Sequence, residues 1–517
     1  MSDKTILAID NGTQSLRAII FDLEGNILAK SQIPITDYQS PQSGWYELNP
    51  TQFWDTLCLA CQRLKSTAPD HFSAVQAVSV TTLRNTVVNL GIDGQPLRPA
   101  IIWTDQRKFE NYEPLKGYWK YLFKIAQLND TLENFQSSCQ AAWIAHHQPE
   151  IWSKTHKYLL LSGYLNYQLT GEYKDSVASQ VSYIPFDYKH HQWAKPSDWK
   201  WQIAPVELNQ LPELVKPGEL IGHLQDKSAK ATGLPQGTPV IAAGADKASE
   251  VLGSGCLEPS QVCLSYGTTA TINVTSEKYL EPIRFIPPYP SSVTDSYTLE
   301  FQINRGYWMV SWFKEEFAHA EQLRSKELGI STEQLLEQSV ANIPPGSDGL
   351  MLQPYWAPGV KIPGPEARGA IIGFKDTHTK SHVYHAILEG IAYSLKEGLE
   401  KIQRKTNHKI TDLYVSGGGS QSDTSMQLTA DIFNLPAIRP HTYETSALGA
   451  AINAAVGMGF YDSYKEAVQS MCRQDKTFHP NPDTVKVYSQ LYNDTYKQMY
   501  KRLKPLYKKL HKIDGLD

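Results

Sequence analysis

The feature that most constrains this chain is a glycine turn that occurs twice between runs of β-branched and apolar residues. The first copy is Asp10-Asn11-Gly12-Thr13, and the second is Tyr266-Gly267-Thr268-Thr269. A glycine turn between such runs is typical of a β-hairpin, and its consecutive backbone N–H groups can bind a phosphate-sized anion. The copies lie about half a chain length apart, so we predict a duplicated architecture in which two hairpins face one nucleotide.

The length of 517 residues is too great for one ordinary hydrophobic core and indicates two or three domains. Apolar residues make up 41% and charged residues 20%, as in ordinary globular proteins. A formal net charge of −4 gives no reason to expect nucleic acid or an anionic membrane as a partner. No apolar run approaches the roughly 18 residues that span a bilayer, and no signal peptide opens the chain. We therefore expect a cytoplasmic protein and leave open whether it forms a homodimer.

The periodicity of the apolar residues indicates a mixed α/β protein. Alternation predicts strands at residues 5–9, 14–22, 27–33, 77–82, 86–90, 100–103, 239–243 and 412–415. Helical spacing dominates residues 132–169 and 381–402. Residues 185–217 are rich in Trp, Pro and His and show no clean period, so we expect loops and short helices there.

Two sets of metal-ligating residue types are better explained by folding than by metal binding. Cys58 and Cys61 form a close pair, but they fall on the apolar face of a helix, and no second Cys or His pair follows nearby. Six cysteines in a chain of this length fit reduced, buried thiols. His378, His382 and His385 share one helical face, and we assign them a structural role.

Two aspartates follow strands, where α/β proteins place their sites. Asp10 ends the first strand beside the first glycine turn, where a carboxylate could hold Mg²⁺ next to bound phosphates. Asp246 follows the apolar run 240–243 and could accept a proton from an attacking hydroxyl. The alternative for Asp246 is to cap the helix that begins near Lys247. Local sequence alone leaves both interpretations open.

A third glycine-rich segment, Gly417-Gly418-Gly419, follows a predicted strand and precedes a helical segment. Its backbone can approach a flat ring or a sugar closely because no side chain stands in the way. The chain has no Walker P-loop pattern, and the third glycine spacing of the Rossmann fingerprint fails. A nucleotide site here therefore requires another fold.

Six segments of the chain, taken in order, resemble the motifs of the FGGY carbohydrate kinases. They are Asp10 to Arg17, Gly244-Ala245-Asp246, Tyr266-Gly267-Thr268, Pro354-Tyr355-Trp356 with Ala367-Arg368-Gly369, Gly417-Gly418-Gly419-Ser420, and Glu444 to Ala451. The match runs from residue 5 to about residue 460. Six ordered motifs are far more specific than any one of them.

The resemblance implies an α/β fold of two actin-like ATPase (ribonuclease-H-like) domains with an interdomain active-site cleft. Residues 1–257 would form the N-terminal, sugar-binding domain. Residues 258–517 would form the C-terminal, ATP-binding domain with a terminal helical extension. The implied reaction is the phosphorylation of a small sugar or polyol with ATP and Mg²⁺, and closure of the two domains would exclude water.

The resemblance also assigns site residues. Asp246 matches the catalytic base, and Asp10 matches the acidic residue near Mg²⁺. The nucleotide side is matched by Thr13, Gln14, Arg17, Gly267, Thr268, Ser311, Gly418, Gly419 and Ser422. The substrate side is matched by Arg84, Asn85, Trp103, Phe135, Asp246 and Lys247. Trp193, Trp199 and Trp201 either line a sugar lid or pack a loop.

The sugar is harder to predict than the reaction. Segments 82–86 and 101–103 resemble the glycerol kinase subgroup. Asn85, however, stands where those enzymes have Glu, and Phe135 stands where they have Tyr, so two polar contacts to glycerol would be lost. We therefore expect a larger polyol or a ketose, with glycerol kinase proper as the alternative. The competing class is a non-catalytic actin-like nucleotide-binding protein or an ATPase that has lost its sugar, neither of which needs the base Asp246.

Overall fold

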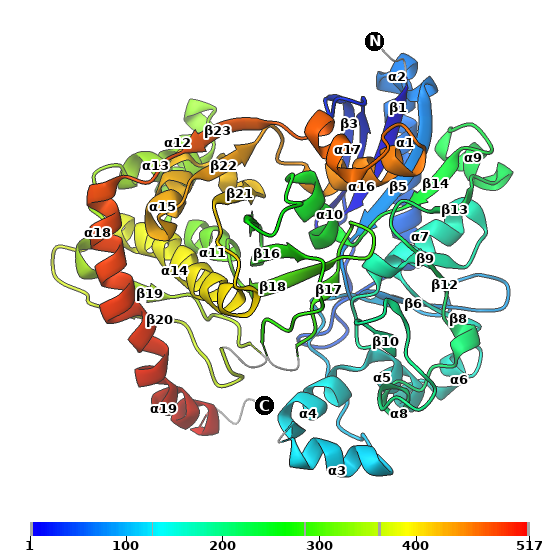
Figure 1. Ribbon diagram of the computed structural model, residues 1–517, viewed down its shortest axis with the longest axis horizontal. Coiled ribbons are helices and arrows are strands. Elements are labelled where there is room, and N and C mark those ends of the chain that lie inside the picture. The colour runs from blue at the N-terminus through cyan, green and yellow to red at the C-terminus, as the bar shows by residue number, and fades with distance from the viewer. Residues whose placement is uncertain (1–3, 127, 284–285, 360–362, 514–517) are drawn as a thin grey trace.

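The computed structural model describes residues 4–126, 128–283, 286–359 and 363–513. It has two lobes, each built around one mixed β-sheet (Figure 1). The N-terminal sheet has the order β13-β14-β5-β1-β2-β3. Its strands are β1 (Thr5–Asn11), β2 (Ser15–Phe21), β3 (Ile27–Pro34), β5 (Val75–Thr82), β13 (Leu220–His223) and β14 (Pro239–Ala242). The predicted opening meander is confirmed, because β1, β2 and β3 are successive antiparallel neighbours.

The C-terminal lobe repeats this arrangement. Its sheet has the order β17-β18-β16-β15-β21-β22-β23. The strands are β15 (Gln261–Tyr266), β16 (Ala270–Ser276), β17 (Tyr289–Pro290), β18 (Tyr297–Ile303), β21 (Asp412–Ser416), β22 (Ala437–Pro440) and β23 (Gln474–Phe478). In each lobe the first strand pairs antiparallel with the second and parallel with a later one, β1 with β2 and β5, and β15 with β16 and β21. The predicted duplication is therefore present in the topology.

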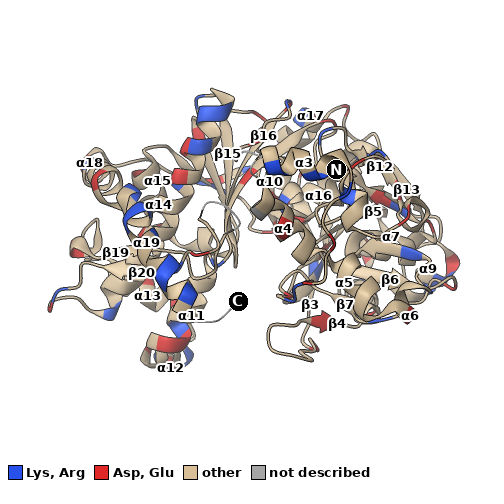
Figure 2. Ribbon diagram, turned by 90° about the horizontal axis from the view of Figure 1, so that it is seen from below, with Lys and Arg blue, Asp and Glu red and all other residues tan. Residues whose placement is uncertain are grey.

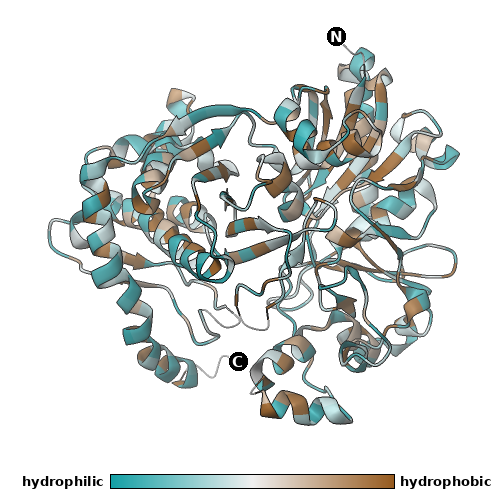
Figure 3. Ribbon diagram, in the orientation of Figure 1, coloured by the Kyte–Doolittle hydropathy of each residue, from teal (hydrophilic) through white to brown (hydrophobic). Residues whose placement is uncertain are grey.

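Helices with apolar stripes cover each sheet and complete the core. They are α1 (Pro50–Thr67) and α7 (Leu161–Thr170) in the N-terminal lobe, and α14 (Lys380–Thr406) and α15 (Asp423–Phe433) in the C-terminal lobe. The side chain of Asn49 caps α1 by accepting the N–H of Thr51. Figure 3 shows apolar segments in the sheet strands, whereas the terminal helices α18 (Pro482–Gln490) and α19 (Lys497–Ile513) are mostly hydrophilic.

Two helices cross between the lobes and pack against each other. They are α10 (Asp246–Gly253), which follows β14, and α16 (Thr445–Gly457). Although α16 comes late in the sequence, its alanines pack with Ile6 and Phe21 of the N-terminal sheet. In turn, α10 places Val251 in a small cluster with Cys263 of the C-terminal strand β15. Helix α16, which follows the C-terminal sheet strands in the chain, therefore packs on the N-terminal lobe, and α10, which follows an N-terminal strand, contacts the C-terminal lobe.

The crossing of α10 and α16 depends on glycine. A Cβ atom on Gly253 would lie 2.0 Å from the carbonyl oxygen of Thr445, and one on Gly449 would lie 1.9 Å from that of Ser249. No side chain tolerates such distances, so the two helix backbones are in direct contact. The following helix α17 (Tyr464–Met471) also packs on the N-terminal side. The division of the chain at residue 257 stays a prediction.

Helices dominate residues 132–169, as predicted, but one strand that the sequence did not indicate interrupts them. The helices α4 (Asn129–Ser138), α5 (Gln140–His147), α6 (Pro149–Trp152) and α7 are interrupted by the strand β8 (Lys157–Leu160). Strand β8 pairs antiparallel with β6 (Val87–Leu90). A four-residue apolar run does not by itself distinguish a strand from a helical turn, and the deciding partner lies far away in the sequence.

Loops and short elements fill residues 185–217, as predicted. The tryptophans of this region pack those loops. Trp193 and Trp201 donate their indole N–H groups to backbone carbonyls. The ring of Trp199 meets that of Phe135 edge to face, with 5.0 Å between the ring centres. Of the two roles left open for these residues, the structure shows loop packing.

The side chains that we discounted as metal ligands have structural roles. Cys58 and Cys61 are buried on α1, and burial raises the pKa of the Cys58 thiol to about 12. His385 is buried and hydrogen-bonded to the hydroxyl of Ser347 at 2.9 Å. Within the described ranges, no group of three or more His, Cys, Asp and Glu side chains could hold a metal ion.

Charges of both signs are interspersed over the two lobes (Figure 2). This distribution agrees with the formal net charge of −4 and presents no single-signed face in that view. Among the described residues, no helix is both long and apolar enough to pass through a lipid bilayer.

Candidate active site

A cavity of about 540 Å³ lies between the two lobes. The N-terminal side contributes Thr13, Arg84, Asn85, Trp103, Phe135, Asp246 and Lys247. The C-terminal side contributes residues that include Thr268, Tyr289, Glu300 and Gln302. All six residues predicted to bind the substrate therefore line the same cavity. Thr13 and Thr268 reach it from the two glycine turns.

Asp246 lies just beyond the carboxyl end of β14 and is the first residue of α10. Ala245, and not Asp246, holds the N-cap position, and Ala245 provides no side-chain cap. The Asp246 carboxylate accepts the N–H of Lys247 at 2.7 Å and lies on the cavity wall. Burial raises the pKa of Asp246, and the charges of Lys247 and Arg84 oppose that rise. A carboxylate whose pKa is raised in this way accepts a proton more readily than a fully solvated one.

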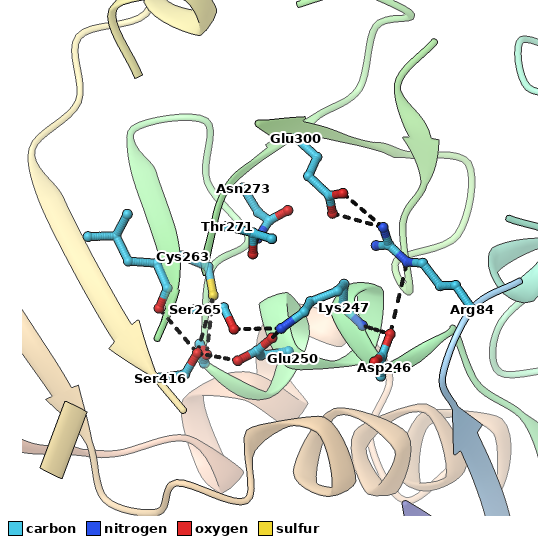
Figure 4. A network of polar contacts seen from close by, with 12 residues as sticks. Arg84, Asp246, Lys247, Glu250, Cys263, Ser265, Thr271, Asn273, Glu300 and Ser416 are labelled. Carbon is cyan, nitrogen blue, oxygen red and sulfur yellow. Dashed lines mark hydrogen bonds and ion pairs between the residues drawn. The ribbon is translucent and has the colours of Figure 1, made fainter. Parts of the chain in front are cut away.

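Arg84 follows β5 and reaches across the cavity to the C-terminal lobe. Its Nη1 donates to both carboxylate oxygens of Glu300, at 2.9 and 3.0 Å. Its guanidinium carbon lies 4.8 Å from the centre of the Tyr289 ring. Its Nε lies 4.0 Å from Asp246 Oδ1 and, although buried, has no hydrogen-bond partner among the described residues. Figure 4 shows the guanidinium facing the carboxylates of both Glu300 and Asp246.

Three other predicted substrate residues present different surfaces to the cavity. Asn85 has a left-handed backbone conformation, with φ at 52°, and its Oδ1 accepts the hydroxyl of Ser182 at 2.6 Å. Trp103 Nε1 donates to Thr13 Oγ1 at 2.8 Å, which joins the substrate side to the first glycine turn. Phe135 offers an aromatic ring without a polar atom. The wall thus combines polar side chains with the aromatic rings of Trp103 and Phe135.

Lys247 lines the cavity, but its ammonium group is engaged by the C-terminal lobe and by its own helix. Its Nζ donates to Glu250 at 2.8 Å and to Ser265 at 2.6 Å (Figure 4). The other carboxylate oxygen of Glu250 accepts the hydroxyl of Ser416 at 2.6 Å. The charge of Lys247 is therefore compensated, and the network joins α10 to β15 and β21.

In the C-terminal lobe, the second glycine turn and the segment Gly417-Gly418-Gly419 lie against each other. A Cβ atom on Gly417 would come within 3.2 Å of the backbone nitrogen of Gly267, and one on Gly419 would come within 2.4 Å of the Tyr307 ring. Tyr307 donates its backbone N–H to Gly267 O at 3.0 Å. Helix α11 (Trp308–Phe317), which carries the exposed Ser311, therefore begins beside the second glycine turn. The predicted nucleotide residues of this lobe come from adjoining segments.

The remaining predicted nucleotide residues differ in how much backbone they expose. A Cβ atom on Gly418 would meet nothing within 4 Å, so this backbone faces open space. Ser422 caps α15, where its hydroxyl accepts the N–H of Ser425 at 3.0 Å. Gln14 is exposed in the first glycine turn, and its carbonyl accepts the N–H of Ile35. Of these residues, Gly418 has the backbone that a bound ring could approach most closely.

Asp10 and Arg17 form an ion pair beside the first glycine turn. They face each other across β1 and β2, and Arg17 Nη1 lies 3.0 Å from Asp10 Oδ2 and 3.5 Å from Glu444 Oε2. Lys30 pairs with the same Glu444. Burial raises the pKa of Asp10 to about 6, against the lowering effect of Arg17. Arg17, predicted to contact phosphate, is thus held between two carboxylates.

The surroundings of Asp10 fit a Mg²⁺ site that phosphate and water complete. Mg²⁺ is usually held by one or two carboxylates together with substrate phosphates and several waters. Asp10 supplies a buried carboxylate beside a phosphate-sized turn, and Asp246 is close enough to raise the pKa of Asp10 further. A divalent cation would favour the ionised form that burial disfavours.

Sequence reasoning missed Glu300 and Glu444. The signal for Glu300 was the strict alternation in β18, where Leu299 and Phe301 join the core and Glu300 faces the opposite side. A charged residue inside such an alternating strand must lie on the face away from the core. Glu444 had no comparable signal, because its partner Lys30 lies 414 positions earlier in the chain.

Two family models match the chain. The N-terminal domain of the FGGY family of carbohydrate kinases matches residues 5–253, and its C-terminal domain matches residues 262–458. The chain belongs to the FGGY family of carbohydrate kinases. The predicted family is thereby confirmed. As a member of the FGGY family, the protein is a kinase that phosphorylates a carbohydrate with ATP.

Relatives of the FGGY family match this chain over nearly its full length. The uncharacterized sugar kinase YgcE of Escherichia coli (strain K12) is 30% identical over 99% of this chain and 97% of its own. The xylulose kinase of Bacillus subtilis (strain 168) is 30% identical over 95% of both chains. The crystal structure of ligand-bound xylulose kinase from Lactobacillus acidophilus matches with a TM-score of 0.82 and 21% identity, over 98% of this chain and 100% of that one.

These FGGY relatives confirm the predicted enzyme class and fold. Because they are named as kinases, the alternative of a non-catalytic nucleotide-binding protein is set aside. The structural match confirms the predicted α/β fold with two actin-like domains.

Proposed function

We propose that this FGGY kinase transfers the γ-phosphoryl group of ATP in line to a hydroxyl of a small polyol or ketose, with Asp246 as the general base and Mg²⁺ as the cofactor. The observation that carries the proposal is the position of Asp246, a half-buried carboxylate on the wall of the interlobe cavity. Thr13 and Thr268 reach the same cavity from the two glycine turns. A base and two phosphate-sized turns around one space are what phosphoryl transfer needs.

Several groups around the cavity would act in this reaction. The substrate hydroxyl would donate a hydrogen bond to Asp246 and give up its proton as the oxygen attacks the γ-phosphorus. Arg84 Nε would hold a neighbouring hydroxyl oxygen, and the Trp103 ring would cover a carbon face. Backbone N–H groups of the glycine turns would bind the phosphate oxygens, where negative charge develops. Closure of the lobes would exclude water as a competing acceptor.

Asp10 would hold Mg²⁺, directly or through water, beside the phosphates. The metal, when bound, neutralises charge on the phosphate oxygens. Arg17 lies 3.0 Å from Asp10 and is itself held by Glu444, so we assign Arg17 the role of positioning the Asp10 carboxylate. This replaces the direct phosphate contact that the sequence predicted for Arg17.

Two observations favour a substrate larger than glycerol. The carboxamide oxygen of Asn85 is engaged by the Ser182 hydroxyl, and Phe135 has no polar atom for a substrate hydroxyl. The cavity of about 540 Å³ falls in the size range of sites for larger small molecules. Glycerol kinase proper remains the second candidate, because segments 82–86 and 101–103 resemble that subgroup.

The test is ADP release from MgATP across a panel of glycerol, pentitols, hexitols, ketoses and aldonates. We expect at least one polyol or ketose to raise ADP release well above the sugar-free rate. If no compound of the panel raises it, the proposed function fails. If glycerol gives the highest kcat/KM, the second candidate replaces the first.

The pH profile of the reaction should report the ionisation of Asp246. A base must be ionised to accept a proton, and burial raises the pKa of Asp246 above its ordinary value of 3.8. As the pH is lowered, the protonated and inactive form of Asp246 therefore accumulates at a higher pH than it would for a solvent-exposed aspartate. We expect kcat/KM to be level near neutral pH and to fall about tenfold per pH unit on the acid side. An acid midpoint at or below 3.8 would contradict this assignment.

A further inference from the structure

The charges on the cavity wall are unusually well paired. Among the described residues that line the cavity, the cationic side chains are Arg84 and Lys247, and the anionic ones are Asp246 and Glu300. Lys247 is compensated by Glu250, which lies behind it at 2.8 Å. Arg84 is compensated by Glu300 across the cavity. Asp246 lies 4.0 Å from Arg84 Nε and shares that cation with Glu300, so both cations of the lining are already paired and the cavity offers no spare cation to an anionic ligand.

Glu300 is a buried residue of the cavity wall and does not lie at the rim of the cavity. Its side chain is only 4% exposed, and it projects from β18 on the face opposite Leu299 and Phe301, which join the core. Both of its oxygens accept from Arg84 Nη1 (Figure 4). A carboxylate with two oxygens has further acceptor capacity, and it has no proton to donate when ionised.

The geometry points to Glu300 as a specificity-determining residue that selects neutral polyhydroxylated substrates and excludes those that carry a carboxylate, such as aldonates. The inference rests on the proposed function and deepens it by naming the chemical class of the substrate. A hydroxyl can donate to Glu300 and accept from Arg84 Nε, which has no hydrogen-bond partner among the described residues. A substrate carboxylate can only accept, and it would face the like charges of Glu300 and Asp246.

The pairing with Arg84 explains why one substitution should change the preference. A guanidinium binds carboxylates through strong charge-assisted hydrogen bonds, and in this cavity Glu300 already takes that role. Glu300→Gln keeps the side-chain shape but removes the charge, so Arg84 becomes available to a substrate carboxylate. The same change weakens the hydrogen bond to a neutral substrate hydroxyl only partly, because the carboxamide oxygen of glutamine still accepts a hydrogen bond.

The experiment compares matched ligands that differ only in their terminal group. D-glucitol and D-gluconate differ at C1, which carries CH₂OH in one and a carboxylate in the other, and xylitol and D-xylonate form a second pair. Binding is measured by calorimetry without ATP, and phosphorylation is measured by ADP release. For the wild-type protein, we expect the polyol of at least one pair to bind about tenfold or more tightly than its aldonate.

Variants then locate the origin of the preference. Glu300→Gln is expected to narrow the polyol-to-aldonate ratio of binding constants by about tenfold or more, whereas Glu300→Asp keeps the charge and should keep most of the preference. The matched control is Glu316→Gln, which makes the same change on the exposed surface of α11 and should leave the ratio unchanged. Thermal unfolding verifies that each variant is folded.

Several results would overturn the inference. One is equal or tighter binding of the aldonates to the wild-type protein, which needs no variant. Another is an unchanged ratio in a folded Glu300→Gln variant, and a third is the failure of both polyols to bind. If the preference is present in binding but no sugar raises ADP release, the proposed function fails while the inference stands. If ADP release is stimulated without the preference, the inference fails alone.

Discussion

Replacing Asp246 by asparagine is expected to lower kcat by about 10²- to 10⁴-fold, the usual contribution of a general base. Asparagine keeps the size of the side chain, but its carboxamide oxygen cannot take the proton of the attacking hydroxyl. The substrate should still bind, because Glu300 continues to hold Arg84, and Trp103 and Phe135 also line the cavity. The substitution should therefore affect kcat far more than KM.

The measurement is steady-state ADP release with the best sugar of the panel. A matched control is Asp226→Asn, because Asp226 is also the first residue of a helix, α9 (Asp226–Thr232), in the same lobe. Its carboxylate is exposed and pairs with Lys230, so its loss should leave kcat within about twofold. Retention of more than about a tenth of wild-type kcat by Asp246→Asn would rule out Asp246 as the base.

Replacing Gly449 by alanine should damage both stability and catalysis. The new methyl group would lie 1.9 Å from the backbone oxygen of Ser249, so α10 and α16 must move apart. Overpacking of this kind typically costs about 1–3 kcal/mol of the free energy of unfolding. Because α10 begins with Asp246, the same movement displaces the base, and a misplacement of about 1 Å can cost about 10²-fold in rate.

The control for this prediction is Gly390→Ala on α14. Its Cβ would lie 2.5 Å from the backbone oxygen of Leu352, so it also meets backbone, but within the C-terminal lobe. We expect both variants to lower Tm and only Gly449→Ala to lower kcat/KM strongly for the folded fraction. Equal effects of the two variants on kcat/KM would contradict a special role for the α10–α16 crossing.

Local patterns explain why the strands and the cavity residues could be predicted. The glycine turns lie between alternating runs, and a hairpin is formed by residues close in the sequence, so β1–β2 and β15–β16 required no knowledge of distant partners. Five of the six predicted substrate residues follow a strand or lie at the start of a helix at the interlobe edge, and the sixth, Phe135, lies within α4. By contrast, β8 was missed because its strand character depends on pairing with β6.

Charge partners were the least predictable part of the site. The sequence placed Arg17 on the phosphate side but did not indicate its charge partners Asp10 and Glu444, the second of which comes from a distant part of the chain. Glu300 could have been found from the alternation in β18, but its partner Arg84 lies 216 positions earlier. A sequence pattern indicates which face a charged residue occupies. It does not indicate which opposite charge the fold brings to that face.

The return of α16 and α17 to the N-terminal lobe also determines when that lobe can be completed during synthesis. The sheet face that carries Ile6 and Phe21 receives a main part of its cover from residues 445–471. Nearly the whole C-terminal sheet is translated before those residues exist. The nascent N-terminal half therefore carries an open apolar face through most of its time on the ribosome, when such a surface is most prone to aggregate.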